Sequence, residues 1–286
     1  MADVGIATAD EVAYFARRRT QNEHDYRSYV DLAHLAPNGA FVARDEGTAV
    51  GIAIAHALED EWQLSEIFLE PTFRGQGVGF ELLTGAAEGA GNVNRSGVVD
   101  PSQPDGLRFY VRQGVPISAP VLEISGEIPR ASELERMAAG EYRFGADSID
   151  PHEQAMALSQ LDREVRGSAR PRDHLYFADH ATGYIFTREN ELAGYAYVWP
   201  SGRIGPMAAV SQVYLVQMLA YALAAARASY GAEWCTMLVP GVNVRILRAC
   251  MRTRLKIVTM KLFATDATST TTLSLERYIA FHSLLF

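Results

Sequence analysis

The chain has 286 residues, a formal net charge of −8 at pH 7 and a pI near 5.4. This length fits two domains of about 140 residues each, and a hydrophobic content of 48% can supply a core for both. Nucleic-acid binding favours a basic face, so the acidic balance argues against a nucleic-acid partner.

The cysteine and histidine pattern predicts no metal site. Cys235 and Cys250 are the only cysteines and lack zinc-ligand spacing, so we expect two free buried thiols in a reducing compartment. His152-Glu153 begins like a zinc-protease motif, but Met156 stands where the second histidine is needed.

Neither a signal peptide nor a membrane span is expected. Asp3, Asp10 and Glu11 interrupt any apolar core at the N-terminus. The longest apolar-rich segment, Val213–Ala228, has 16 residues, which is short for a span. We therefore expect a cytoplasmic protein that has no membrane partner.

The chain begins with a predicted strand and helix. Residues Ile6–Val12 have the pattern of a strand end followed by a capped helix, with Thr8 or Asp10 as the cap. The cationic run Arg17–Arg19 is interpreted as a solvated helix face, with a place at a substrate entrance as the alternative.

Further strands of the first half follow from apolar runs. Ala40–Ala43 and Val50–Ala57 flank an Asp-Glu-Gly turn and predict a hairpin. Val121–Ile124 predicts the closing strand of this half. The weakest region is Gly89–Val99, where only the last two residues have strand character.

The most informative motif is the segment Arg74–Gly79, which reads Arg-Gly-Gln-Gly-Val-Gly. It follows the apolar run Leu64–Leu69 and precedes the helix-like stretch Phe80–Ala87. Glycines let the backbone come close to a ligand, and N–H groups at a helix N-terminus attract anions. The order of strand, glycine-rich turn and helix therefore predicts a site for a diphosphate.

The spacing in this loop excludes two common phosphate motifs and matches a third. Phe80-Glu81 follows the last glycine, where a Walker loop needs Lys-Ser/Thr, and the dinucleotide fingerprint is also absent. Arg74-x-x-Gly77-x-Gly79 resembles the coenzyme A loop of the GNAT acetyltransferase superfamily. The resemblance implies that acetyl-CoA is the cosubstrate and that these residues bind it: Ile67, Phe68, Leu69, Arg74, Gly75, Gln76, Gly77, Val78 and Gly79.

A second matching segment lies downstream of the loop. Phe109, Tyr110 and Gly114 match the family pattern, whereas Gln103 stands where Asn is usual and Gly106 where Ala is usual. The resemblance implies that the Tyr110 hydroxyl returns a proton to the departing thiolate, which suits a phenol. The alternative is a packing aromatic beside Phe109.

For the base that deprotonates an amine we select Glu66. Alternate residues of a strand share a face, so Glu66 shares one with Phe68 and Glu70 and can lie in a partly buried cleft. The alternative is a solvated carboxylate at a strand edge. Leu69 is the predicted source of an N–H that stabilises the oxyanion, and Ile67 and Phe68 are in line to pair with the pantetheine arm.

The second half repeats the order of the first at the scale of a domain. A strand, a helix, a hairpin turned at Glu189–Glu191, a strand and a long helix are predicted, at Glu141–Phe144, Asp150–Val165, Thr182–Val198, Gly202–Met207 and Val213–Ala228. This order resembles the tandem GNAT arrangement.

The second copy lacks the phosphate loop. Val210–Tyr214 stands where glycines are needed, and side chains there would block close approach of the backbone. Asn243 matches the family's strand exit, but Cys250 falls in the Tyr slot and Arg254 in the Gly slot. We expect a catalytically silent domain that completes the acceptor cleft.

The sequence thus predicts a mixed α/β fold of two tandem GNAT-like domains, each a mostly antiparallel central sheet flanked by helices. The predicted boundaries are 1–128, a linker at 129–140, and 141–286. The implied function is acetyl transfer from acetyl-CoA to the amine of a small molecule. Alternatives are a non-catalytic acyl-CoA-binding protein, or an enzyme acting on an acyl-carrier thioester by decarboxylation or S-acyl transfer. His24, Tyr26 and Tyr29 are candidates for acceptor contact.

Overall fold

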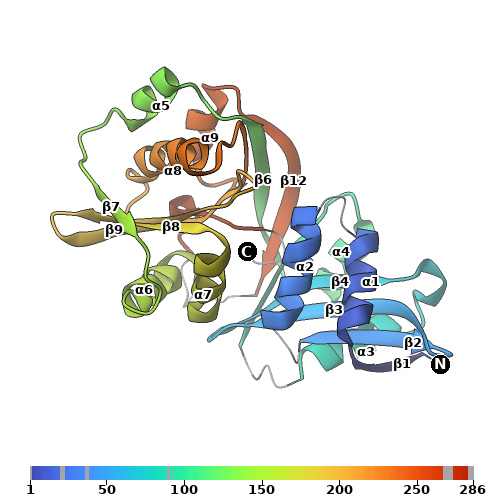
Figure 1. Cartoon of the computed structure of the whole chain (residues 1–286). Helices are drawn as coiled ribbons and strands as arrows, with labels where there is room; N and C mark the ends of the chain where they lie inside the picture. Colours follow the sequence, from blue (N-terminus) through green and yellow to red (C-terminus); the bar gives the residue numbers. More distant parts are fainter. Residues whose placement is uncertain are drawn as a thin grey trace.

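The computed structural model describes residues 2–19, 23–35, 39–88, 91, 93–266 and 273–282. The elements of the first half are β1 (Asp3–Ile6), α1 (Ala9–Arg19), α2 (Glu23–Leu35), β2 (Ala40–Asp45), β3 (Thr48–Ala57), β4 (Glu61–Leu69), η1 (Pro71–Phe73), α3 (Val78–Ala86), β5 (Asn94–Val99), α4 (Pro104–Arg112) and β6 (Ile117–Glu127). Helices cover both faces of the sheet that these strands form (Figure 1).

The second half contributes the remaining elements. They are α5 (Ala131–Ala138), β7 (Gly145–Ser148), α6 (Ala155–Arg166), α7 (Pro171–His180), β8 (Thr182–Arg188), β9 (Glu191–Val198), β10 (Ile204–Ala209), α8 (Leu215–Tyr230), β11 (Trp234–Pro240), α9 (Val244–Met251), β12 (Lys256–Thr265), η2 (Leu275–Arg277) and β13 (Tyr278–Ile279). None of the described helices is long and apolar enough to cross a membrane.

Two sheets flanked by helices confirm the predicted fold class. The described strands form an eight-stranded sheet, ordered β1-β2-β3-β4-β5-β12-β6-β11, and a five-stranded sheet, ordered β13-β10-β9-β8-β7. Most neighbouring strands are antiparallel, and β4 with β5 is the parallel pair that matters for the site.

Several local predictions are confirmed by the structure. Thr8, rather than Asp10, caps α1: its N–H donates to the Glu11 carboxylate (2.8 Å) and its hydroxyl accepts from the Glu11 N–H (3.3 Å), a reciprocal capping box. The predicted hairpins are present as β2–β3 and β8–β9. Cys235 and Cys250 are free and buried, and burial raises the pKa of each thiol to about 12.

Other local predictions are wrong, and tertiary contacts explain why. Residues 141–144 form no strand, because the rings of Tyr142 and Phe144 pack against Tyr214 instead, with centroids 4.9 and 5.2 Å away. The strand lies at 145–148 and pairs with β8. β5 begins at Asn94, well before the two valines that suggested it, because its first residues pair with β4.

The two halves exchange strands. β12 lies between β5 and β6, with Leu262 opposite Val99 and Lys261 opposite Val121. In turn, β11 of the second half pairs along its whole length with residues 121–127 of β6. Figure 1 shows β6 and β12 running side by side between the halves. The boundaries at 128 and 141 stay a prediction about sequence segments, and the predicted linker contains α5.

Apolar clusters distinguish the two faces of the larger sheet. Phe15, Tyr29 and Phe263 belong to a cluster on the face covered by α1 and α2, and this cluster continues into α6 and α7 of the second half. Leu64 and Tyr110 belong to another cluster, beneath α3 and α4. The larger sheet therefore has one face whose apolar cluster extends into the second half, and one face whose cluster lies beneath α3 and α4.

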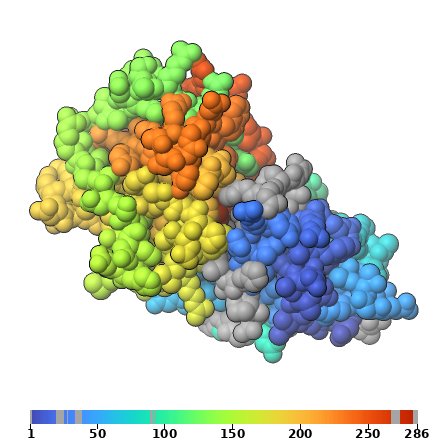
Figure 2. Space-filling view, viewed as in Figure 1, coloured from blue at the N-terminus to red at the C-terminus, as the bar shows by residue number. Residues whose placement is uncertain are grey.

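Buried polar pairs also join the halves. His56 of β3 lies 2.7 Å from the carboxylate of Asp173 in α7, and Arg166 of α6 donates to Glu61 of β4 (2.8 Å). Figure 2 shows the yellow segment of the second half packed against the blue N-terminal helices. Removing one partner of a buried ion pair such as Arg166–Glu61 is costly, so this contact helps to fix the two halves against each other.

Candidate functional site

The site begins where two strands diverge, at a point that we call the first fork. β4 and β5 pair in parallel from Glu61 and Asn94 to Leu64 and Gly97, and then separate. Beyond this point residues 65–69 keep β3 as their neighbour, and no other described strand covers their second edge. The pairing of β4 with β3 has a bulge at Ser65, next to the fork, and a bulge bends the strand that contains it.

The main chain of β4 offers specific groups to the fork. The Glu70 N–H donates to the Val50 carbonyl of β3 (2.9 Å). Because amides alternate along a strand, those of Ile67 and Leu69 point to the fork and that of Phe68 points to β3. The N–H group of Phe68 is therefore turned away from a ligand in the fork, whereas the N–H groups of Ile67 and Leu69 point toward it.

Tyr110 extends from α4 to the point of divergence. Its buried hydroxyl lies 3.5 Å from the carbonyl oxygen of Leu64, the last residue of β4 that pairs with β5. The opposite residue on β5 is Gly97, where a Cβ would overlap this hydroxyl, so the glycine makes the position of Tyr110 possible. Burial, with the charge of Glu66 as the second cause, holds the pKa of Tyr110 well above its ordinary value.

Glu66 lies on the opposite face, largely buried, with 15% of its side chain exposed. Its carboxylate is 3.4 Å from the Arg19 guanidinium, which also lies 4.9 Å from the centre of the Phe68 ring. Burial raises the pKa of Glu66, and the positive charges of Arg19 and Lys261 offset part of the rise.

The cationic run on α1 contacts β4, so its interpretation as a solvated face is only partly right. Arg18 lies 2.6 Å from the Glu70 carboxylate, beside the Arg19–Glu66 pair. These side chains remain partly exposed, 43% for Arg18 and 29% for Arg19. The run therefore lies along Glu66 of β4 and Glu70 just after it, on the face of the sheet that α1 covers.

The glycine-rich loop is exposed. Gly75 and Gly77 have φ values of +79° and +90°, which few other residues adopt. A Cβ added at Gly75, Gly77 or Gly79 would meet nothing within 4 Å. Helix α3 starts at Val78, two residues earlier than predicted, and no side chain caps it. Arg74 donates to the Leu69 carbonyl (3.1 Å), which fixes the loop to the end of β4.

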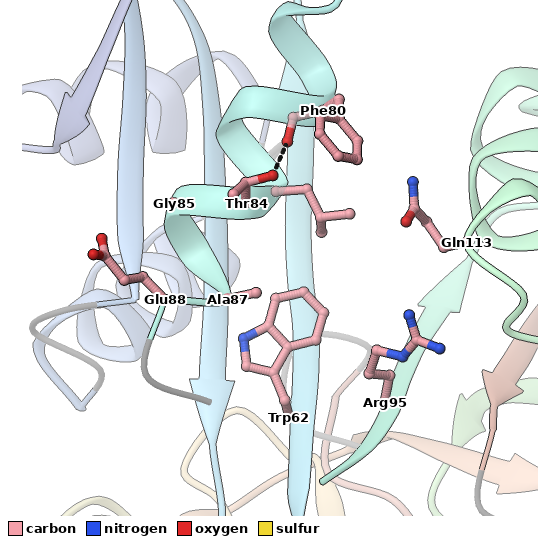
Figure 3. Close-up of a pocket in the computed structure, with 9 residues that line it drawn as sticks. Trp62, Phe80, Thr84, Gly85, Ala87, Glu88, Arg95 and Gln113 are labelled. Carbon is pink, nitrogen blue, oxygen red and sulfur yellow. Dashed lines mark hydrogen bonds between the residues drawn. The ribbon is translucent and has the colours of Figure 1, made fainter. Parts of the chain in front are cut away.

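A groove of about 570 Å³ lies between α3 and the strands β4 and β5, with Gln113, just after α4, at its edge. Figure 3 shows Phe80 at its upper end, with Trp62 and Arg95 below and Gln113 facing it from the far side. Trp62 and Arg95 are paired two positions before the fork. This groove therefore adjoins the loop, but it is not the place where the strands diverge.

The residues predicted to contact an acceptor are only partly described. Tyr29 is buried, with 1% exposed, and its hydroxyl has no hydrogen-bond partner within the described part of the chain. Tyr26 is half-buried, with the Arg17 guanidinium 5.9 Å from its ring centre. The His24 side chain lies outside the described residues. Lys261, which the sequence did not single out, reaches this face only because β12 is exchanged between the halves.

The second half has a corresponding fork between β10 and β11, which we call the second fork. One bridge, between Arg203 and Thr236, joins the two strands. Beyond it lies the chain's own segment 277–281: Ile279 pairs with Met207 of β10, and the Ala280 N–H donates to the Leu238 carbonyl of β11 (2.8 Å).

Side chains of the second half hold this segment in place. The Asn243 amide donates to the Tyr278 carbonyl (3.0 Å), and Arg203 donates to the carbonyl of Phe281 (3.0 Å). Where the first half has its glycine loop, Tyr214 packs its ring against two other aromatic rings. The second fork is thus filled by protein.

Residues 7–115 match the model of the acetyltransferase (GNAT) family. No curated protein matches the sequence significantly. A solved structure of a putative acetyltransferase from Pyrococcus horikoshii is 16% identical, with a TM-score of 0.75 over 100% of this chain and 96% of that one.

Two further solved structures share the fold along both halves. A GCN5-related N-acetyltransferase from Sphaerobacter thermophilus is 13% identical, with a TM-score of 0.63 over 93% of this chain and 95% of that one. A tandem GNAT protein from the clavulanic acid biosynthesis pathway is 17% identical, with a TM-score of 0.60 over 93% and 98%. At such identities the likeness shows the fold, here a tandem of two GNAT-like halves.

Proposed function

Because residues 7–115 belong to the GNAT acetyltransferase family, we propose that this protein transfers an acetyl group from acetyl-CoA to the amine of a small-molecule acceptor. The observation that carries the proposal is the meeting of three features at the first fork. An exposed glycine loop, a buried carboxylate and a buried phenol all lie along the free edge of one strand.

The loop Arg74–Gly79 fits the diphosphate of the coenzyme. Its glycine positions are open, so nothing prevents an anion from reaching the amides at the start of α3, where the helix dipole also favours negative charge. Arg74 adds a cation whose side chain is 49% exposed. When bound, the coenzyme supplies an acyl group activated as a thioester, and the free edge of β4 can hold the amides of its arm.

Glu66 is proposed as the base. An amine must lose a proton to attack, and a base works best when its pKa is near the working pH. Burial moves the pKa of Glu66 in that direction, while its partial exposure leaves access for a proton. The Arg19 guanidinium holds the carboxylate in position.

Tyr110 is proposed as the acid, in a way that depends on Glu66. With its pKa raised, the phenol by itself is a weak donor. Part of that rise comes from the negative charge of Glu66. Once Glu66 has taken up the amine's proton this charge is gone, so the Tyr110 pKa falls when a proton is needed at the fork.

The oxyanion donor is better assigned to Ile67 than to Leu69. Both amides face the fork, but strands rise about 3.3 Å per residue, so Leu69 lies roughly 16 Å along the strand from Leu64. The Tyr110 hydroxyl lies beside Leu64. The Ile67 amide is about 7 Å nearer to Leu64 along the strand than the Leu69 amide, so it is the better placed of the two to act together with Tyr110.

The proposal is tested by measuring thiol release from acetyl-CoA with a broad panel of amines, alongside calorimetric titration of the coenzyme. We expect coenzyme binding and amine-dependent release of free thiol. Binding without release for any amine would instead support a non-catalytic acyl-CoA-binding protein. Activity on an acyl-carrier thioester without free coenzyme A would support the third alternative.

A further inference from the structure

We propose that three buried side chains, those of Arg166, Glu61 and Ser96, form a link through which the second half holds the strands of the first fork in place for Tyr110. They act on the reaction through Tyr110 and are therefore positioning residues. The inference rests on the proposed function, in which Tyr110 is the acid, and it gives the second half a task in that reaction.

The link runs from the second half to β4 and then to β5. The Arg166 guanidinium of α6 donates to one oxygen of the Glu61 carboxylate in β4 (2.8 Å), and the Ser96 hydroxyl of β5 donates to the other oxygen. The three residues are 4%, 6% and 1% exposed. A buried carboxylate is costly unless it is paired and hydrogen-bonded, so Arg166 and Ser96 together hold Glu61 in one position.

The turn that follows α6 fixes Arg166 against β4. The Arg166 guanidinium also donates to the carbonyl of Ser168 (3.0 Å), and the Ser168 hydroxyl accepts from the Asp60 N–H (3.4 Å), just before β4. Gly167 between them has a φ of +87°, the left-handed conformation that glycine adopts most readily. The second half therefore contacts the start of β4 both through the Arg166 side chain and through this turn.

Strand register places the link directly before the first fork. Ser96 lies opposite Gln63, and the next pair, Gly97 with Leu64, is the last before β4 and β5 separate. Glu61 is two positions before Gln63, so its side chain reaches Ser96 diagonally across the two strands. The link therefore joins β4 to β5 at the point where their separation begins.

Tyr110 depends on the same stretch of β5 from the other face of the sheet. Ser96 and Val98 alternate with Gly97, and Val98 packs against the apolar cluster that extends into the second half. Gly97 therefore turns to the face beneath α4, where a Cβ on it would lie 2.0 Å from the Tyr110 hydroxyl. Because the approach is so close, a shift of β5 at Ser96 would displace the phenol from its place beside the Leu64 carbonyl.

The direct test is ¹⁹F NMR on protein that contains 3-fluorotyrosine, and it needs no turnover. The signal that is lost in Tyr110→Phe assigns the Tyr110 resonance. We expect Ser96→Ala and Arg166→Met to shift this resonance and Arg163→Met to leave it in place. Arg163 is the matched control, because it also lies on α6 and pairs with Glu59 of the first half, but both side chains are about half exposed (46% and 51%).

Ser96→Ala is the decisive variant. It removes a neutral hydroxyl and leaves Glu61 paired with Arg166, so the protein should fold. Arg166→Met leaves the Glu61 carboxylate unpaired and removes a charge that also acts on Asp173 and Tyr278 in the second half. A Tyr110 resonance that shifts in Arg166→Met and not in Ser96→Ala would mean that Arg166 acts through its own half, and it would overturn the proposal. An equal shift in Arg163→Met would overturn it too.

The kinetic test is a double-mutant cycle with Tyr110→Phe. Ser96→Ala alone should lower kcat about 3- to 10-fold and leave the coenzyme Kd unchanged, because a small misplacement of a catalytic group is costly. In the Tyr110→Phe background it should lower kcat no further, since the group that it positions is gone. Equal losses in both backgrounds would show an effect that does not pass through Tyr110 and would overturn the link. If no amine is acetylated while the Tyr110 resonance still shifts in Ser96→Ala, the proposed reaction fails and the link stands.

Discussion

The first and second forks of the molecule both open beyond a parallel contact between two strands, and they have different contents. In the first, the edge of β4 beyond Leu64 has no described strand partner, and the loop that follows is exposed. In the second, residues 277–281 lie between β10 and β11 and hydrogen-bond to both. The arrangement of the strands at a fork therefore does not by itself determine whether a ligand can enter. The segments around the fork do.

The segment in the second fork resembles a coenzyme arm in its chemistry. An extended peptide and a pantetheine arm both present amide groups that can pair with a strand edge. Asn243, which the sequence matched to a family position, donates its side-chain amide to the Tyr278 carbonyl. The second half thus fills its fork with a segment of its own chain.

The largest effect is expected from filling the loop of the first fork. Gly77→Val puts a branched side chain where the diphosphate must lie, so the coenzyme Kd, measured by calorimetry, should rise at least about 100-fold. Gly47→Val is the matched control, because Gly47 also has positive φ (+80°) and open surroundings but lies in the β2–β3 turn. Both variants should lose about 1 to 2 kcal/mol of stability from strain. Retained binding in Gly77→Val would remove the loop from the site.

Glu66→Gln should reduce kcat/KM by about 10²- to 10⁴-fold, the usual contribution of a general base. The unaltered enzyme should lose activity as pH falls through the Glu66 pKa, because the protonated carboxyl cannot accept a proton. Since burial raises that pKa, this acid limb should lie above the ordinary range of a glutamate. Arg19→Met should shift it further upward, because a cation that lowers the pKa is removed. A pH–rate profile that is unchanged in Glu66→Gln contradicts the assignment.

Tyr110→Phe should lower kcat by about tenfold or more and leave the coenzyme Kd nearly unchanged, because the ring still fills its place over Gly97. Single-turnover kinetics with the best amine, together with calorimetry, separate the two quantities. Phe109→Leu is a suitable control for packing, since its ring contacts Tyr110 edge-on at 5.9 Å. Full turnover in Tyr110→Phe would make the acid assignment wrong.

The sequence predicted what depends on local chemistry. The glycine loop, the capped first helix and both hairpins rest on short patterns that tertiary contacts did not override. It also predicted that Glu66 and Phe68 share a face, since strand alternation is a local property. The roles of Glu66 and Tyr110 remain predictions.

What the sequence missed depends on strand exchange. No local pattern shows that β12 enters the sheet between β5 and β6, so Lys261 could not be associated with Glu66. For the same reason the segment 277–281 gave no sign of its place in the second fork. The strand predicted at 141–144 failed because aromatic packing against Tyr214 replaced pairing there.

The smallest effect on coenzyme binding should come from the second fork, where the change should be one of stability alone. Asn243→Ala removes the cap of α9 and leaves the buried Tyr278 carbonyl without this donor, so unfolding in urea should show a loss of about 2 to 4 kcal/mol. Asn243→Asp retains an oxygen for the cap but places a buried carboxylate oxygen against the Tyr278 carbonyl oxygen, so its loss should be at least as large. Calorimetry should give one coenzyme per chain for the unaltered protein and for both variants, with the same Kd. A second binding event in the unaltered protein would mean that the segment 277–281 yields to the coenzyme, and the contrast between the forks would then be one of affinity rather than of access.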